Sequence, residues 1–221
     1  MTTRKYTAHE KNPGIWRLTN MGHSSTRNRF EFDVRWPGIL EVELNTRGNR
    51  IRVIEDSLNG RRTVRDDPFK PGRNGLVGLA QCIESHSPLA LVILMLGTND
   101  FQSMHTHDIW HSAQGIAALI SQIRLAPMEP GMPIPLALVV ASPPIQNPRG
   151  AIAPKFTGGD EKCVRLAEAY RKVAIDHACH FFDSATVTSS SKIDGVHLDA
   201  DQHLTLGKAI AAVVEPLLMK Q

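Results

Sequence analysis

The stretch LALVILML at residues 89–96 decides the fold class, because it is apolar at every position and ends at Gly97. A short apolar run of this kind is typical of a strand buried on both faces, in a parallel sheet covered by helices. LALVV at 136–140 is a second such run, and RIRVIE at 50–55 and CHFFD at 179–183 are weaker candidates. Apolar residues recur at helical spacing in four other segments, at 36–44, 110–125, 161–179 and 205–218. Strands that alternate with helices predict βαβ units and an α/β fold with a parallel sheet.

The composition is that of an ordinary soluble globular protein, with 42% apolar and 21% charged residues. The length of 221 residues fits one domain over 1–221. Because the net charge of +3 is small and the basic residues are dispersed, nucleic acid is not an expected partner. The densest basic patch, Arg61, Arg62 and Arg65, is followed directly by Asp66 and Asp67, which predicts a solvated loop.

Cysteine usage and hydropathy bear on the location of the protein. Cys82, Cys163 and Cys179 have no CxxC spacing, and their odd number argues against a disulfide framework. The longest apolar run, at 89–96, falls short of the roughly 20 residues that span a bilayer. The first residues, MTTRKYTAHEKNPG, lack the apolar region of a secretory signal. We therefore expect a cytoplasmic protein without a membrane partner.

Gly97-Thr98-Asn99-Asp100 comes directly after the most apolar run. Ligands of open α/β sheets bind beyond the carboxyl ends of the strands, so this segment is a candidate for the functional site. Glycine allows a tight turn there, and an asparagine amide can donate a hydrogen bond to a developing oxyanion. The same residue types are also common in turns that only end a strand.

Asp194-Gly195-Val196-His197 is the second candidate segment. A carboxylate three residues before an imidazole can orient the ring and stabilise its protonated form. The histidine can then act as a general base toward a hydroxyl nucleophile. Taken alone, this motif also fits a surface turn before a helix.

GTND at 97–100 together with DGVH at 194–197 resembles the SGNH/GDSL hydrolases, whose third block is GxND and whose fifth is DxxH. The sequence is most similar to the bacterial arylesterase/acyltransferase branch, through FEFDVRWPGILEVEL (30–44), VIEDSLNGRRTVRDDP (53–68), SHSPLALVILMLGTND (85–100) and VVASPP (139–144). The resemblance implies a three-layer α/β/α sandwich, a flavodoxin-like fold with a parallel sheet of about five strands.

The same resemblance implies a serine ester hydrolase or acyltransferase that acts on short acyl or aryl esters and needs no cofactor. His197 would be the general base and Asp194 its partner. Asn99 would donate its side-chain amide to the oxyanion hole. Ser57 stands where this branch often has glycine and would donate its backbone N–H, although it could also simply begin a loop.

Gly97, Thr98 and Asp100 would form the turn that supports this oxyanion hole. Members of this branch commonly form homo-oligomers, so the protein is expected to be one as well. The long loops at 101–112 and 143–160 would then be available for contacts between subunits.

The first block of the family, GDSL, carries the serine nucleophile on the first strand, and it is absent here. Asp56-Ser57-Leu58 looks similar but occupies the second block. The segment HEKNPGIWRLTNMG at 9–22 has Pro13-Gly14 where the first strand is expected and contains no apolar run. The sequence therefore predicts that this strand is lost or distorted together with the nucleophile.

A frameshift would explain both losses. The codons of residues 9–23, read one base forward, permit MKKILVFGDSLTWG, which is a start codon, an apolar strand and the missing block. Two shifted codons are forced, to glycine across 16–17 and to tryptophan across 21–22. On this hypothesis the serine codon spans Leu18 and Thr19, so the nucleophile is expected near Leu18.

Two other functions fit the sequence. The literal sequence supports a catalytically inactive homologue that keeps the fold, because no serine stands in the first block. A metal-dependent hydrolase is the weaker alternative. The only histidine cluster, His105, His107 and His111 with Asp108, lacks the HExxH arrangement.

Overall fold

The structure is a computed structural model that describes residues 14–19 and 29–219, with only the backbone described for 14–19. Within these residues one sheet of five parallel strands has the order β2-β1-β3-β4-β5. The strands are β1 (Gly14–Thr19), β2 (Arg52–Ser57), β3 (Leu89–Met95), β4 (Leu136–Ala141) and β5 (His180–Asp183). This is the flavodoxin-like strand order. It confirms the predicted parallel sheet.

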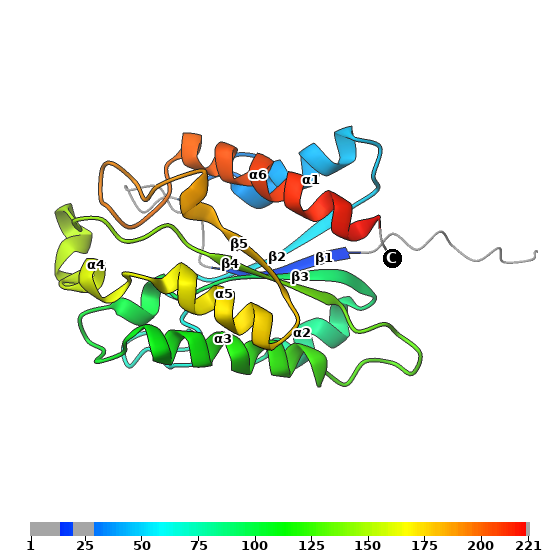
Figure 1. Cartoon of the computed structure of the whole chain (residues 1–221), viewed down its shortest axis with the longest axis horizontal. Helices are drawn as coiled ribbons and strands as arrows, with labels where there is room; N and C mark the ends of the chain where they lie inside the picture. The colour runs from blue at the N-terminus through cyan, green and yellow to red at the C-terminus, as the bar shows by residue number, and fades with distance from the viewer. Residues whose placement is uncertain (1–13, 20–28, 220–221) are drawn as a thin grey trace, which may run out of the picture.

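Helices cover both faces of the sheet (Figure 1). One face carries α1 (Trp36–Thr46) and α6 (Ala200–Leu218), and the other carries α2 (Leu79–His86), α3 (Ile109–Arg124) and α5 (Leu166–Asp176). The short helix α4 (Gly159–Lys162) and the 3-10 turns η1 (Thr98–Phe101), η2 (Gly150–Phe156) and η3 (Ser184–Thr186) lie in the connections. The predicted α/β/α sandwich is therefore confirmed.

Strand β3 is the centre of the core because all seven of its residues are buried. Successive side chains of a strand point to opposite faces of the sheet. Val92 and Leu94 accordingly pack with α2, α3 and α5, whereas Leu91 and Ile93 pack with α1 and α6. Two apolar clusters on opposite faces explain why LALVILML has no polar residue.

Strand β1 corrects the prediction that the first strand is lost. The backbone of Gly14–Thr19 pairs in parallel with β2 on one side and with β3 on the other. Strands β2 and β3 lie on either side of this position, and without a strand between them their facing backbone N–H and C=O groups would have no partner. The rest of the segment that carries the frameshift hypothesis, 9–13 and 20–23, lies outside the described residues.

The predicted helix over 161–179 is wrong in its continuity. The chain forms α4, then α5, with Arg165 between them in the left-handed region at φ 67°. Val164, which the apolar pattern assigned to the buried stripe, is exposed. The last helix begins at Ala200 rather than at 205, because Asp199 and Gln202 form a capping box before the apolar pattern starts.

Two expectations from composition concern the described residues directly. The three cysteines are free thiols, and Cys163 is buried. No helix in the part of the chain that the structure describes is long and apolar enough to cross a membrane.

Two elements were not predicted from the apolar pattern: α2, which has only eight residues, and β1.

Replacing Leu94 with alanine tests the position of the core. Leu94 is fully buried in β3, so Leu94→Ala is expected to lower the free energy of unfolding by about 2–5 kcal/mol. Leu125→Ala is the matched control, because Leu125 is 78% exposed and its loss should change that free energy by less than about 0.5 kcal/mol. Equal effects of the two substitutions in urea unfolding would contradict the described packing.

Candidate active site

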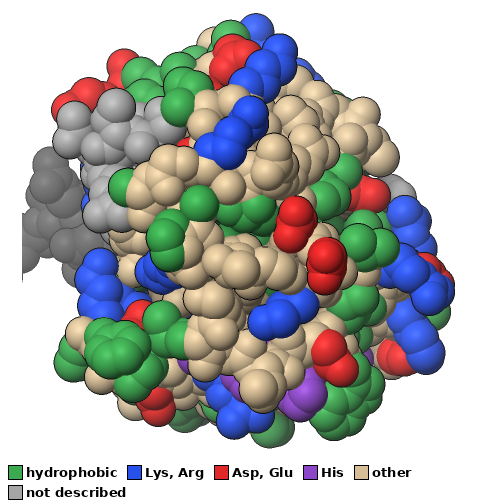
Figure 2. Space-filling model, turned by 90° about the vertical axis from the view of Figure 1, so that its left-hand side faces the viewer, with side chains coloured by type: hydrophobic (Ala, Val, Ile, Leu, Met, Phe, Trp, Pro, Cys, Tyr) green, Lys and Arg blue, Asp and Glu red, His purple; other side chains and the backbone are tan. Residues whose placement is uncertain are grey.

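The carboxyl ends of the strands meet at one edge of the sheet, on the left in Figure 1 and facing the viewer in Figure 2. A pocket of about 70 Å³ lies there. It is built from the segments that follow β2, β3 and β4 and from the turn before α6. Its lining residues are Trp36, Asn59, Met95, Thr98, Asn99, Ser142, Pro143, Phe156, Val196, His197, Leu198 and His203. The structure thus brings His197, Asn99 and Thr98 together, as the sequence predicted.

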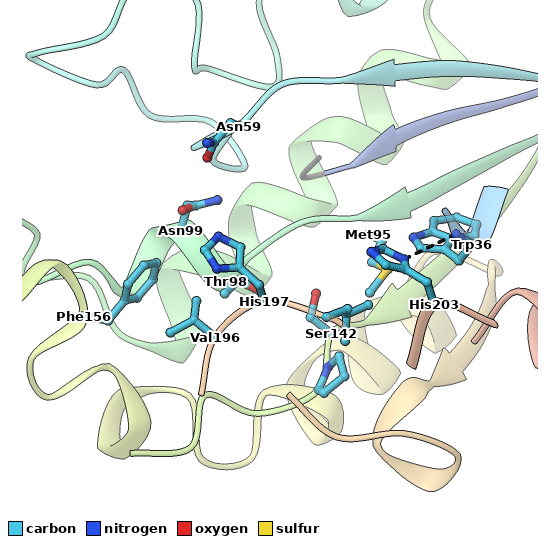
Figure 3. A pocket seen from close by; sticks show the side chains of 12 residues that line it. Trp36, Asn59, Met95, Thr98, Asn99, Ser142, Phe156, Val196, His197 and His203 are labelled. Carbon is cyan, nitrogen blue, oxygen red and sulfur yellow. Dashed lines mark hydrogen bonds between the residues drawn. The ribbon is translucent and has the colours of Figure 1, made fainter. Parts of the chain in front are cut away.

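Asp194 and His197 form the hydrogen bond that a carboxylate-oriented base requires. His197 Nδ1 lies 2.6 Å from Asp194 Oδ2, and Asp194 Oδ1 accepts from the backbone N–H groups of Val196 and His197 at 2.8 and 3.0 Å. When Nδ1 donates its proton to the carboxylate, Nε2 of the neutral ring is the basic nitrogen. His197 points into the pocket toward Asn99 (Figure 3).

A glycine makes this turn possible. Gly195 has φ 76°, and a Cβ at this position would lie 2.0 Å from the carbonyl oxygen of Gln146. The Gly195 carbonyl accepts from the backbone N–H of Gln146 at 2.9 Å. The glycine of DGVH is therefore a structural requirement, because only it allows the turn to pack against the loop after β4.

The carboxyl of Asp194 is held in its ionised form. Burial raises its pKa, but the hydrogen bond from the His197 ring and the two backbone N–H groups outweigh burial and lower the pKa to about 2. Its side chain is only 8% exposed, so solvent screens these interactions little. The carboxylate remains available to stabilise an imidazolium at every pH above this value.

The GTND segment divides its residues between the pocket and the protein interior. Gly97 has φ 122°, and a Cβ there would lie 2.2 Å from the hydroxyl of Tyr170. Thr98 and Asn99 line the pocket. Asp100 turns away from it, accepting from the backbone N–H and the hydroxyl of Thr63 at 3.0 and 2.8 Å. Burial raises the pKa of Asp100 although these hydrogen bonds oppose the shift. Asp100 thus anchors the turn that presents Asn99.

Ser57 and Leu18 are placed by the strands that carry them. Ser57 is buried at the end of β2 and is not among the residues that line the pocket, whereas Asn59 is. The backbone of Leu18 is in register with Asp56 of β2 and with Leu94 of β3. The expected nucleophile position therefore lies at the carboxyl end of the strand between β2 and β3.

The basic segment after β2 is only in part the solvated loop that the sequence predicted, because only Arg65 and Asp66 of its charged residues are exposed. Arg61 and Arg62 are both buried. Arg61 donates to the carbonyl and to Oδ1 of Asp56 at 2.9 and 3.0 Å, and Arg62 Nη1 lies 2.9 Å from Asp67 Oδ2. A run of basic and acidic residues is typical of a surface loop, but here Arg62 and Asp67 pair with each other in the interior.

The histidine cluster is occupied by other interactions. The rings of His105 and His107 stack with centroids 5.0 Å apart. His105 Nε2 lies 2.6 Å from Arg62 Nε, and His111 Nδ1 lies 2.7 Å from Asp108 Oδ1. Among the described residues no group of His, Cys, Asp and Glu side chains is arranged to hold a metal ion.

Several pocket residues escaped prediction. Trp36, Met95 and His203 form the end of the pocket opposite Asn99 (Figure 3). Trp36 and Met95 belong to apolar runs, so nothing in the sequence separates them from ordinary core residues. His203 Nδ1 accepts from the backbone N–H of Trp36 at 3.3 Å, a contact that only the packing of α1 against α6 creates.

The ionised state of Asp194 gives a pH-dependent prediction. A pKa lowered from 3.8 to about 2 stabilises the fold above pH 4 by about 2 kcal/mol, and this stabilisation is lost as pH falls from 4 toward 2. Asp194→Asn should therefore lower the free energy of unfolding at pH 7, and the gap to the unmodified protein should narrow below pH 4. A gap that is the same at pH 7 and pH 3 in urea unfolding would contradict the assignment.

Comparison with known proteins places this geometry in a family. The model of the GDSL-like lipase/acylhydrolase family matches residues 20–207. The match begins directly after β1, so the strand that should carry the nucleophile lies outside it. A search of curated proteins found no match.

Solved structures give a consistent result. An aryl esterase from M. smegmatis is 33% identical, with a TM-score of 0.85 over 93% of this chain and 99% of its own. Est24, a carbohydrate acetylesterase from Sinorhizobium meliloti, is 31% identical with the same TM-score of 0.85 and the same coverage of 93% and 99%. By its family and by these structures, the chain is a carboxylic ester hydrolase that belongs to the GDSL-like lipase/acylhydrolase family.

Proposed function

We propose that this fold serves a serine ester hydrolase or acyltransferase that acts on short acyl or aryl esters through an acyl-enzyme. The observation that carries the proposal is the 2.6 Å hydrogen bond between Asp194 and His197, with the ring directed into a pocket that Asn99 also lines. His197 is the general base, Asp194 its partner and Asn99 the side-chain donor of the oxyanion hole. Ser57 at the end of β2 contributes its backbone N–H.

The proposed reaction needs a serine at the carboxyl end of β1. Its hydroxyl gives a proton to His197 Nε2 as its oxygen attacks the ester carbonyl carbon. The carbonyl oxygen becomes negatively charged and accepts a hydrogen bond from the side-chain N–H of Asn99. The leaving alcohol takes the proton from His197. Water or a second alcohol then attacks the acyl-enzyme by the reverse sequence of proton transfers, giving the acid or a new ester.

The size of the pocket supports a short acyl group. Pockets for drug-sized ligands occupy about 300–1,000 Å³. The pocket here, about 70 Å³, is far smaller. Apolar side chains of Phe156 and Val196 lie beside His197 (Figure 3), which suits an alkyl chain of few carbons.

The sequence of β1 favours a second candidate, a catalytically inactive homologue. GIWRLT contains no serine, and Leu18 stands where the frameshift hypothesis puts the nucleophile. Without a nucleophile the Asp194–His197 pair cannot form an acyl-enzyme. Nucleotide sequencing distinguishes the two candidates at the level of the gene, because the hypothesis requires a serine codon across Leu18 and Thr19 in the shifted frame.

Restoring the block tests the proposal at the level of the protein. The version in which MKKILVFGDSLTWG replaces residues 9–23 should hydrolyse p-nitrophenyl acetate more than about 10³-fold faster than the chain as written. Alanine at the restored serine, or His197→Ala, should remove the gain. A restored version without turnover that depends on His197 would refute the esterase proposal. Equal activity with and without the block would show that another residue is the nucleophile.

Assembly and location stay predictions. Homo-oligomerisation through the loops at 101–112 and 143–160 is implied by the resemblance. A cytoplasmic location is proposed because three free cysteines fit a reducing compartment. Sedimentation of the purified full chain measures the first of these.

A further inference from the structure

We propose that Gln102 and Arg62 form a positioning relay that fixes the side-chain amide of Asn99 with its nitrogen toward the pocket. This rests on the proposed function, in which the Asn99 side-chain N–H donates to the oxyanion, and that donor would depend on both residues. Neither Gln102 nor Arg62 lines the pocket, so both act through Asn99.

Arg62 is the fixed point of the relay. It is 0% exposed, and a buried guanidinium is tolerated only where its charge and its N–H groups are matched. Asp67 Oδ2 lies 2.9 Å from Nη1, and His105 Nε2 lies 2.6 Å from Nε. The remaining nitrogen, Nη2, donates to Gln102 Oε1 at 2.6 Å. These contacts hold the guanidinium from three sides.

The guanidinium determines the orientation of both amides. Arginine has only donors, so the Gln102 atom that faces it must be the carbonyl oxygen. The amide nitrogen of Gln102 then faces Asn99 and donates to its Oδ1 at 2.6 Å. The Asn99 nitrogen is consequently on the other side, where it donates to the carbonyl of Arg61 at 3.1 Å. Reversal of either amide would bring two donors or two acceptors face to face.

This orientation provides what an oxyanion hole needs. The amide nitrogen of Asn99 carries two N–H groups, and the Arg61 carbonyl accepts from one of them. The second N–H is then available to the pocket that Asn99 and His197 line, and Figure 3 shows the amide nitrogen of Asn99 on the side of the His197 ring. Because Gln102 and Arg62 are both fully buried, the donor is held before substrate binds and need not reorganise during reaction.

The charge of Arg62 also strengthens the donor. Hydrogen bonds in a chain polarise one another, and a cation at one end withdraws electron density along the chain. Arg62 polarises the Gln102 carbonyl, which makes the Gln102 N–H a stronger donor to Asn99. His105 supports this arrangement as a neutral ring, since burial and the adjacent guanidinium lower its pKa to about 4.

Two substitutions of Gln102 distinguish the relay from a purely structural role. Gln102→Glu keeps the volume and the contact with Arg62, but it places a carboxylate oxygen against Asn99 Oδ1 and so should reverse the Asn99 amide. Gln102→Leu removes both contacts and only releases that amide. The relay therefore predicts that stability and activity rank the two variants in opposite orders. Gln102→Leu is the less stable variant, whereas Gln102→Glu is the less active one.

The activity arm uses the version with the restored block. Gln102→Glu should lower kcat by about 10²-fold, the cost of losing an oxyanion donor, with KM nearly unchanged. Gln102→Leu should lower kcat by less, although it unfolds at a lower urea concentration. Gln202→Leu is the matched control, because Gln202 is also a buried glutamine but donates to Ser190 and accepts from Asp199 instead. It should lose stability and keep kcat.

The amide arm uses the chain as written and needs no turnover. The side-chain N–H signals of Asn99, assigned in ¹H–¹⁵N spectra by their loss in Asn99→Asp, should move downfield in Gln102→Glu, because they then donate to a carboxylate. They should stay in place in Gln202→Leu. Unmoved Asn99 signals in Gln102→Glu, or activities that follow stability across the three variants, would overturn the relay. An inactive restored version with shifted Asn99 signals would refute the esterase proposal alone.

Discussion

The parallel direction of the five strands is the constraint on which the site depends. Parallel strands bring all their carboxyl ends to one edge, so residues far apart in the sequence meet there without any dedicated contact. The ends of β2, β3 and β4 and the turn before α6 supply the pocket for this reason. β1 has a particular importance, because the backbone ladders of both β2 and β3 are completed by it. Sheet geometry thus keeps a strand at the position where the nucleophile is expected, even though that strand, GIWRLT, contains no serine.

Behind the pocket, buried polar contacts hold the loops in addition to apolar packing. Asp100 binds Thr63, and Arg62 binds Asp67, Gln102 and His105. Such groups are costly to bury alone, and each is stabilising only when its partners are all present. This network connects the loop after β2 with the loop after β3, so that the donor Asn99 and the strand end at Ser57 are held in one frame.

The fold could be predicted from the sequence, as could the meeting of Asn99 and His197 at one pocket. Prediction failed where a charged residue is buried or lies in a central strand. LALVILML could be assigned because a fully apolar run has few alternatives, and Asn99 because it follows this run. Asp194 and His197 were predicted for another reason, the spacing of a carboxylate three residues before an imidazole. GIWRLT was not predicted as a strand, because Pro13-Gly14 at its start and Arg17 within it argue against a central strand. Only the neighbouring strands require one there. Arg62 was missed for a related reason: its partners lie at Asp67, Gln102 and His105, and no local pattern shows that they enclose it. Arg165 similarly interrupts an apolar period that should have continued.

In the proposed function, the serine hydrolase site lacks only the serine on β1. Covalent labelling with a fluorophosphonate tests this proposal most directly. Intact-mass and peptide mass spectrometry report how many labels are attached and to which residue. We expect the restored version to be labelled once, on the serine at the end of β1, and the chain as written not to be labelled. Labelling of the chain as written on another residue would contradict the proposal, as would a restored version that hydrolyses esters without being labelled at that serine.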